Sequence, residues 1–115
     1  MATYDLEDRT LKFAQEVRKF TSELPKTNEN IEDIKQLTRA SASVGANYIE
    51  ANESLGDKDK IMHLKISKKE SKECRFFARL VETGGSRDLQ SQREKIIKEA
   101  TEIMNIIGSI IRKLS

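Results

Sequence analysis

The sequence predicts an all-α protein in which residues 1–115 form one domain, an antiparallel up-down-up-down four-helix bundle. Four segments carry apolar residues at alternating spacings of three and four, which is the pattern of an amphipathic helix. The chain has one Pro, five Gly and 35% charged residues, a composition typical of long helices with solvated faces. We expect helices over about 5–24, 28–55, 58–83 and 87–114, joined by connections too short for another topology.

The first predicted helix, residues 5–24, opens with the acidic residues Asp5, Glu7 and Asp8, which suit the positive end of a helix dipole. Its apolar stripe consists of Leu6, Thr10, Phe13, Val17, Phe20 and Leu24. Pro25 cannot continue a helix and ends the segment.

The second predicted helix, residues 28–55, follows a cluster of good N-cap residues at 27–30. Its stripe consists of Ile34, Leu37, Ser41, Val44, Tyr48, Ala51 and Leu55. Gly56 is a natural C-terminal stop, and Asp57 is placed to cap the helix that follows.

The third predicted helix, residues 58–83, has a stripe made mostly of small residues. Its members are Ile61, Leu64, Ser67, Ser71, Cys74, Ala78 and Val81. We expect Phe76, Phe77 and Leu80 to add bulk near its end, before the flexible turn Thr83–Ser86.

The fourth predicted helix, residues 87–114, has the clearest periodicity. Its stripe consists of Leu89, Arg93, Ile96, Ala100, Ile103, Ile107, Ile110 and Leu114. Arg112 and Lys113 complement the negative end of the helix dipole.

Several classes of protein are excluded by what the sequence lacks. No run of about 18 apolar residues is present, so we expect no membrane-spanning helix. The N-terminus has no basic region followed by an apolar one, so we expect no secretory signal and a cytoplasmic protein. The lone Cys74 forms no intramolecular disulfide and is expected to be a small buried hydrophobe.

Catalytic and metal-binding patterns are also missing, so we expect no enzyme and no cofactor. A di-iron bundle needs two Glu-x-x-His motifs, but His63 is the single histidine and has no Glu at that offset. One Cys and one His do not make a zinc site. Cys74 lies about three turns from His63 on one helix, which disfavours a catalytic dyad.

The stretch 43–52, "SVGANYIEAN", places Gly in the middle of a helix, where it costs about 1 kcal/mol relative to Ala. Ser41 and Gly45 lie one turn apart, and Ala42 and Ala46 repeat this spacing beside them. We expect these small residues to pack closely against the small-residue row of the third helix, where dispersion at short range offsets the cost of the glycine.

Close packing would also explain the polar residues of the second helix. Ser43, Asn47 and Asn52 are expected to hydrogen-bond across a narrow gap. We expect one of two acidic pairs, Glu50 with Glu53 or Glu70 with Glu73, to form a partly buried network with Arg39 or Arg75. The alternative is that these charges solvate an exposed face. The predicted helix-packing motif comprises Arg39, Ser41, Ser43, Gly45, Ala46, Asn47 and Glu50.

The same residues carry a resemblance to a known family. The matching positions are Phe13, Ala14, Val17, Leu24, Pro25, Lys26, Gln36, Leu37, Arg39, Ser41, Ser43, Val44, Ala46, Asn47, Glu50, Ala51, Lys65, Ile66, Lys69, Glu70, Lys72, Glu73, Arg75 and Leu80. In this pattern the chain resembles the four-helix-bundle proteins encoded in intervening sequences of bacterial 23S ribosomal RNA genes. The resemblance implies a homopentamer and a relation to accessory proteins of diversity-generating retroelements, which bind nucleic acid and a reverse transcriptase. It implies no molecular function for the intervening-sequence branch itself.

The fourth helix predicts self-association independently of the resemblance. Ile97, Met104, Ile106 and Ile111 widen its apolar arc beyond the single stripe that a bundle of this size needs. Excess apolar surface tends to mark an interface, so we expect a homo-oligomer. The alternative is a wider intramolecular core that takes up these side chains.

The third helix carries a basic row with three-four spacing: Lys65, Lys68, Lys72, Arg75 and Arg79. A row of cations can bind the phosphate backbone of RNA or DNA, and an oligomer would multiply it. The alternative is a solvated face partly neutralised by Glu70 and Glu73. The sequence thus predicts a non-enzymatic oligomer that binds RNA or DNA backbone through this row. The alternative is a structural or protein-binding oligomer without a nucleic-acid role. In neither case do we expect a membrane partner.

Overall fold

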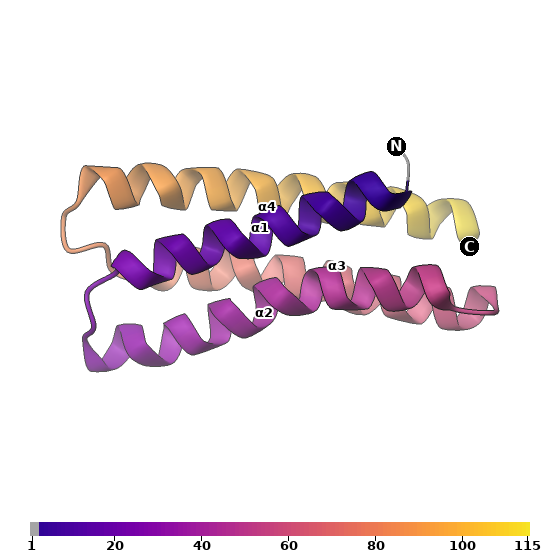
Figure 1. The fold of residues 1–115 in the computed structure, drawn as a ribbon, viewed down its shortest axis with the longest axis horizontal. Helices are drawn as coiled ribbons and strands as arrows, with labels where there is room; N and C mark the ends of the chain where they lie inside the picture. The colour runs from indigo at the N-terminus through magenta and orange to yellow at the C-terminus, as the bar shows by residue number, and fades with distance from the viewer. Residues whose placement is uncertain (1–2) are drawn as a thin grey trace.

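Four long helices make up the computed structural model, which describes residues 3–115, with side chains from Asp5 onwards (Figure 1). They are α1 (Thr3–Glu23), α2 (Asn28–Glu53), α3 (Asp57–Leu80) and α4 (Arg87–Leu114). No strand occurs between residues 3 and 115. The predicted all-α fold is confirmed.

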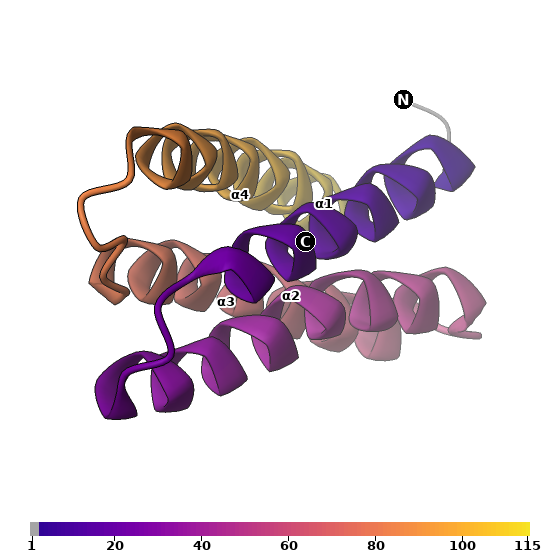
Figure 2. The same ribbon diagram turned by 60° about the vertical axis from the view of Figure 1, so that its left-hand side comes forward.

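Each helix runs antiparallel to the next one along the chain, as Figures 1 and 2 show. Between α2 and α3, Arg39 contacts Glu70 while Asn47 contacts His63, so one partner number rises as the other falls. The helices in contact are α1 and α2, α2 and α3, α3 and α4, and α1 and α4, which closes a ring of neighbours around one core. The contact between α2 and α3 is the most extensive of the four.

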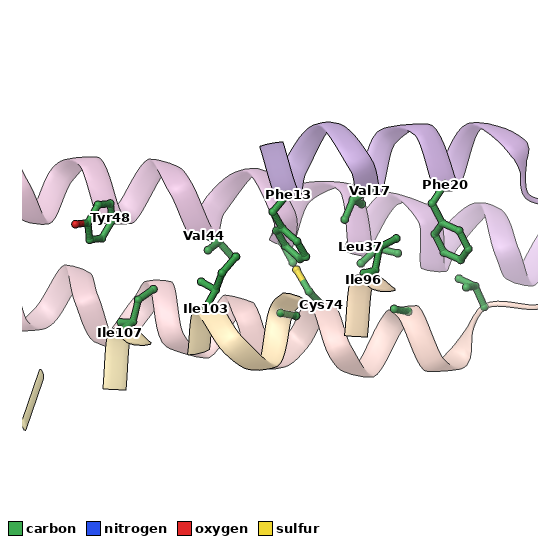
Figure 3. Close-up of a cluster of buried hydrophobic side chains, with 14 of the residues drawn as sticks. Phe13, Val17, Phe20, Leu37, Val44, Tyr48, Cys74, Ile96, Ile103 and Ile107 are labelled. Carbon is green, nitrogen blue, oxygen red and sulfur yellow. The ribbon is translucent and has the colours of Figure 1, made fainter. Parts of the chain in front are cut away.

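The core lies along the middle of the bundle and is built from the predicted stripes (Figure 3). Its largest fully buried side chains are Leu6, Phe13, Val17, Phe20, Leu37, Val44, Leu64, Val81, Ile96, Ile103 and Ile107. Cys74 has a free thiol and is fully buried in the core, as expected. Burial of about a dozen such side chains, each contributing roughly 1.5–3 kcal/mol, is the main stabilising term of this fold.

The turn between α2 and α3 differs from the sequence-based expectation. The helix α2 ends at Glu53, and Leu55, which was expected to join the core stripe, lies beyond it and is fully exposed. Gly56 occupies the N-cap position of α3 with an extended backbone, so Asp57 is the first helical residue and not the cap. The connection between α2 and α3 is three residues long, and the side chains of Ser54 and Leu55 do not join the core.

The helix α3 stops at Leu80, three residues earlier than predicted, because the backbone that follows is bound by side chains of other elements. The buried Asn30 donates from Nδ2 to the carbonyl oxygens of Pro25 (3.0 Å) and Glu82 (2.8 Å), and its Oδ1 accepts from the amide of Glu82 (2.9 Å). Arg93 donates to the carbonyl oxygen of Val81 (3.0 Å). These bonds replace the helical ones and hold both connections at this end of the bundle.

An ion-pair network joins α1 to α4. Arg9 makes a two-point contact with Glu99, from Nε to Oε2 (2.7 Å) and from Nη2 to Oε1 (2.8 Å), and it also reaches Glu102 at 3.1 Å. The hydrogen bond to Glu99 raises the pKa of the Arg9 guanidinium above its usual range, against the opposing effect of burial. Two-point geometry of this kind fixes orientation as well as supplying energy.

Candidate nucleic-acid interface

Gly45 lies against α1, not against α3 as the sequence led us to expect. A Cβ placed on Gly45 would stand 3.0 Å from Oγ1 and 3.3 Å from Cβ of Thr10, and no atom of α3 is among its three nearest neighbours. The prediction that a glycine permits close helix packing therefore holds for a different pair of helices. Ala46 is exposed beside it and lines the same outer groove between α1 and α2.

The close approach of α2 and α3 depends instead on serines. Ser67 is fully buried, and its hydroxyl donates across the interface to the backbone carbonyl of Val44 at 2.7 Å. Ser71 and Ser41 are also buried, and their hydroxyls donate hydrogen bonds to backbone carbonyls of their own helices. A hydroxyl that bonds a neighbouring backbone needs the helices to be close, so the small row of α3 does face α2.

One charged side chain, Glu70, is buried at this interface and is only 6% exposed. Its carboxylate accepts hydrogen bonds from Arg39 of α2 (Nη1 to Oε2, 3.1 Å) and from the hydroxyl of Ser43 (3.2 Å). Arg39 reaches Glu73 as well, at 3.2 Å. The contact with Glu70 is the main cause of a raised pKa at Arg39. The expected pairing of Arg39 is thus present, whereas Arg75 pairs with neither carboxylate.

The remaining polar residues of α2 are divided between two neighbours. Asn47 donates to the carbonyl and hydroxyl oxygens of Ser43, and its Oδ1 lies 3.3 Å from Nδ1 of His63 on α3. Asn52 crosses in the other direction and donates to Glu7 on α1 at 2.9 Å. Glu50 is exposed, and its backbone carbonyl accepts from the hydroxyl of Ser54.

The predicted basic row faces outward along α3. Lys65, Lys68, Lys72 and Arg79 are exposed, and Arg75 is half-buried with Nη1 3.7 Å from the sulfur of Met104. Within residues 5–115, none of these five side chains forms an ion pair. The two carboxylates that could have neutralised the row, Glu70 and Glu73, bind Arg39 instead.

Arg112 of α4 lies close to the basic row, beside Gly108. This residue is buried, and a Cβ placed on it would stand 3.5 Å from both Nζ of Lys68 and Nη1 of Arg112. Two cationic groups therefore approach each other over the glycine, and neither forms an ion pair with a side chain of residues 5–115. Such a pair repels itself and offers a favourable position to a bound anion such as a phosphate.

Apolar surface is interspersed with these charges on the outer face of α3. A shallow groove of about 630 Å³ is lined by Lys58, Ile61, Met62, Lys65, Ile66 and Lys69. Further along the helix, Phe76 and Leu80 are 60% and 50% exposed, although we expected both to add bulk to the core. Phe77 alone of the three packs against the core. The face therefore combines cations with exposed apolar groups.

The apolar residues proposed from sequence as an oligomer interface are half-buried on α4. Ile97, Ile106 and Ile111 pack against the core of their own chain, and Met104 contacts Arg75. A second apolar groove, of about 350 Å³, lies between α1 and α2. Its floor is formed by Ala14, Ala42, Gly45 and Ala46, and its rims carry the exposed Leu11 and Ile49.

The thiol of Cys74 is enclosed in the core. Burial is the main reason why the pKa of the Cys74 thiol is raised far above its usual value, and the nearby charges of Glu70 and Glu73 raise it further. In the part of the chain that the structure describes, no three His, Cys, Asp or Glu side chains converge as a metal site requires. None of the helices between residues 3 and 115 is long and apolar enough to span a bilayer.

The fold and this surface define a class of small four-helix-bundle proteins with a cationic outer face. The chain belongs to the 23S rRNA-intervening sequence protein family, whose sequence model matches residues 3–109. A similar solved structure is a protein with unknown function from the S23 ribosomal protein family of Bacteroides thetaiotaomicron. It shares 29% sequence identity and a TM-score of 0.82, over 97% of this chain and 99% of that one. No curated protein matches the chain significantly.

Three residues of this face, the exposed Arg112 and Phe76 and the buried Gly108, are not predicted from the sequence as parts of it. From the sequence, Arg112 is expected to complement the helix dipole and Phe76 to add bulk near the end of its helix, and Gly108 carries no prediction. Phe76 lies one turn beyond Lys72, and this spacing is a sequence signal that it shares the face of the basic row. The sequence contains no such signal for Gly108, because its role depends on which residue of α3 lies against it.

Proposed function

We propose that this protein is a non-enzymatic helical-bundle protein that binds the backbone of RNA or DNA through the basic row of α3. The observation that carries the proposal is the engagement of Glu70 and Glu73 by Arg39, while the cations of the basic row form no ion pair with any side chain of residues 5–115. The convergence of Lys68 and Arg112 over Gly108 supports it, because it extends the cationic surface from α3 onto α4.

A backbone-binding surface of this kind acts by releasing counterions from the nucleic acid, so its affinity falls steeply with salt. The formal net charge of the chain is only +2, which makes the local arrangement more important than the total. In a symmetric oligomer several copies of the row would contact one strand, and the effective concentration of each further contact would raise the affinity.

The test is the salt dependence of binding, measured by fluorescence anisotropy with a labelled RNA oligonucleotide and its DNA counterpart. We expect affinity to fall by orders of magnitude between about 50 and 200 mM salt. Charge reversal of the row, Lys68→Glu, Lys72→Glu and Arg75→Glu together, should abolish binding. The matched control reverses Lys12, Lys19 and Lys95, three exposed cations of the α1–α4 side with the same total charge.

Retained binding in the control and lost binding in the row variant would support the proposal. Equal loss in both variants would mean that only the net charge matters, and no binding by the unmodified protein would remove the proposal altogether. Circular dichroism of both triple variants distinguishes lost binding from lost folding.

A second candidate function is self-assembly, and the groove between α1 and α2 favours it. Exposed Leu11 and Ile49 flank a floor of small side chains, which permits close approach of a helix from a second copy. The family resemblance suggests a homopentamer. The predicted contact through Ile97, Met104, Ile106 and Ile111 is the competing arrangement.

Light scattering tests self-assembly and the two contact surfaces together. We expect a mass several times 13.1 kDa, reduced to the monomer by Leu11→Glu with Ile49→Glu. Met104→Glu should leave the mass unchanged if the α1–α2 groove is the contact. Dissociation by Met104→Glu alone would assign the contact to α4, and a 13.1 kDa mass for the unmodified protein at micromolar concentration would exclude a stable oligomer.

A further inference from the structure

Phe76 is the most exposed aromatic residue among residues 5–115, with 60% of its area open to solvent. Lys72 precedes it by one helical turn, and Arg79 follows it by about one turn on the same face of α3. Both cations are exposed and without ion-pair partners among residues 5–115. An apolar ring therefore lies between two cations that form no ion pair with any side chain of residues 5–115.

The ring of Phe76 is held in place and is not a loose surface group. It meets Phe77 edge to face, with ring centroids 5.2 Å apart and planes at 84°. Phe77 is half-buried and packs against the core, so the contact fixes the outer ring to the body of the protein. An anchored aromatic ring loses little freedom when a second flat group is placed on it, which favours binding.

We propose that Phe76 is a stacking site for an unpaired base of a nucleic-acid strand whose phosphates are bound by Lys72 and Arg79. This inference rests on the proposed function and makes it more specific, because it selects single strands, bulges and loops over continuous duplex. In a duplex both faces of each base are covered by its neighbours, whereas an unpaired base offers a face to an aromatic side chain. Stacking of this kind tolerates any base, so the preference concerns strand state and not sequence.

The charges decide between a nucleic acid and a protein as the occupant of this site. A protein partner would bury Phe76 and Leu80 but would also have to desolvate Lys72 and Arg79, which is costly for unpaired cations. A polyanion satisfies the cations and supplies flat bases at regular intervals along the same strand. The surface is thus matched to a single strand by both its charge and its apolar component.

The experiment compares binding of a single-stranded oligouridylate, its deoxythymidylate counterpart and a hairpin duplex with the same number of phosphates. We expect the single strands to bind more tightly than the duplex at equal salt. Phe76→Leu keeps apolar bulk but removes the ring, and it should weaken single-strand binding by about 5- to 150-fold with little change for the duplex. Leu80→Ala, one turn further along, is the matched control and should change neither affinity appreciably.

Phe76→Trp provides a direct readout of stacking because the chain contains no tryptophan. We expect this variant to retain tight single-strand binding and its indole fluorescence to be quenched by single strands but not by the duplex. Unchanged fluorescence on saturation with a single strand would overturn the inference, since the ring would then not contact a base. Equal affinity of the Phe76→Leu variant and the unmodified protein for single strands would also overturn it.

The controls separate this inference from the proposed function. Salt-dependent binding that treats single strands and duplex alike would overturn base stacking while leaving backbone binding by the row intact. Absence of salt-dependent binding to every probe would overturn both. A fall in the light-scattering mass of Phe76→Leu, with unchanged affinity for single strands, would assign Phe76 to a contact between protein chains.

Discussion

Gly45 of α2 and Thr10 of α1 approach so closely that a Cβ on the glycine would stand 3.0 Å from the threonine hydroxyl oxygen. Thr10 cannot readily move away, because it is 1% exposed and its hydroxyl donates to the carbonyl oxygen of Glu7 at 2.9 Å. The glycine is therefore a spacer that sets the distance between these two helices. Its cost in helix propensity, about 1 kcal/mol, is offset by the packing that it allows.

Substitution of Gly45 should destabilise the bundle in proportion to the size of the new side chain. We expect Gly45→Leu to lower the free energy of unfolding by about 3 kcal/mol, because the side chain must displace α1. Gly45→Ala should also destabilise, since the steric conflict with Thr10 outweighs the gain in helix propensity. Urea unfolding followed by circular dichroism gives both values.

A double-mutant cycle identifies the neighbour of Gly45. Thr10→Ala removes the closest atom, so the effect of Gly45→Ala should be smaller in that background by about 0.5 kcal/mol or more. Ser67→Ala, on α3, should leave the effect of Gly45→Ala unchanged. Coupling to Ser67 instead of Thr10 would contradict the assignment of this glycine to the α1–α2 contact.

Gly108 should respond in the opposite sense. A Cβ there would meet the flexible ends of Lys68 and Arg112 at 3.5 Å, an ordinary van der Waals distance. We therefore expect Gly108→Ala to raise the free energy of unfolding by up to about 1 kcal/mol through helix propensity alone. A loss of stability in thermal or urea unfolding would show that the two cations over this glycine cannot adjust.

Arg39 should be more important to stability than its own exposure suggests. Arg39→Ala leaves the carboxylate of Glu70 buried with Ser43 as its remaining donor among residues 5–115, and we expect a loss of about 2–3 kcal/mol. Arg39→Lys keeps the charge but loses the planar two-point contact, so its effect should be intermediate. The control is Lys35→Ala, whose exposed pair with Glu32 should contribute under about 1 kcal/mol.

The stability of the protein should decline at alkaline pH because of Cys74. Burial raises the pKa of this thiol in the folded state, so the unfolded chain loses the thiol proton first as the pH rises past roughly 8.5. The stabilising contribution is complete below that pH and decreases above it by up to about 1.4 kcal/mol per pH unit.

The measurement is the slope of unfolding free energy against pH in the unmodified protein and in Cys74→Ala. Groups other than the thiol titrate in both proteins, so the difference between the slopes isolates Cys74. We expect a shallower decline in the variant between about pH 8.5 and 10. Parallel slopes would mean that the thiol ionises as readily in the folded protein as in the unfolded chain.

Much of the fold follows from periodicity alone. The spacing of residues such as Phe13, Val44 and Ile103 identifies the buried face of each helix, and short connections then require antiparallel neighbours. Cap residues gave the start of α2, where the side chain of Thr27 accepts from the amide of Asn30 at 3.2 Å. These features are local, so a single sequence is enough to predict them.

Features that depend on which helix lies on which side could not be predicted in this way. A helical wheel places Gly45 at the edge of the buried stripe, but the edge faces α1 in one hand of the bundle and α3 in the other. Phe76 was assigned to the core because it is apolar, although its angular position agreed with that of the basic row. The basic row itself was found from spacing, whereas its lack of carboxylate partners depends on the reach of Arg39 from a different helix.

The end of α3 was misjudged for a related reason. Residues 81–83 continue an acceptable helical pattern, and only the contacts of Asn30 and Arg93 with this segment show why the helix stops. Asn30 was recognised as part of a cap cluster, but its partners are distant in the sequence. Long-range hydrogen bonds of this type leave no periodic signal.

Three hydrogen bonds of the Asn30 side chain join the connection at Pro25 to the connection at Glu82. Neither connection can therefore detach without disturbing the other, and this end of the bundle should behave as one cooperative unit in native-state hydrogen exchange. At the opposite end, the turn around Leu55 is exposed and should open independently. The two ends of one small bundle thus differ in local stability, and the basic face of α3 runs from the looser end to the firmer one.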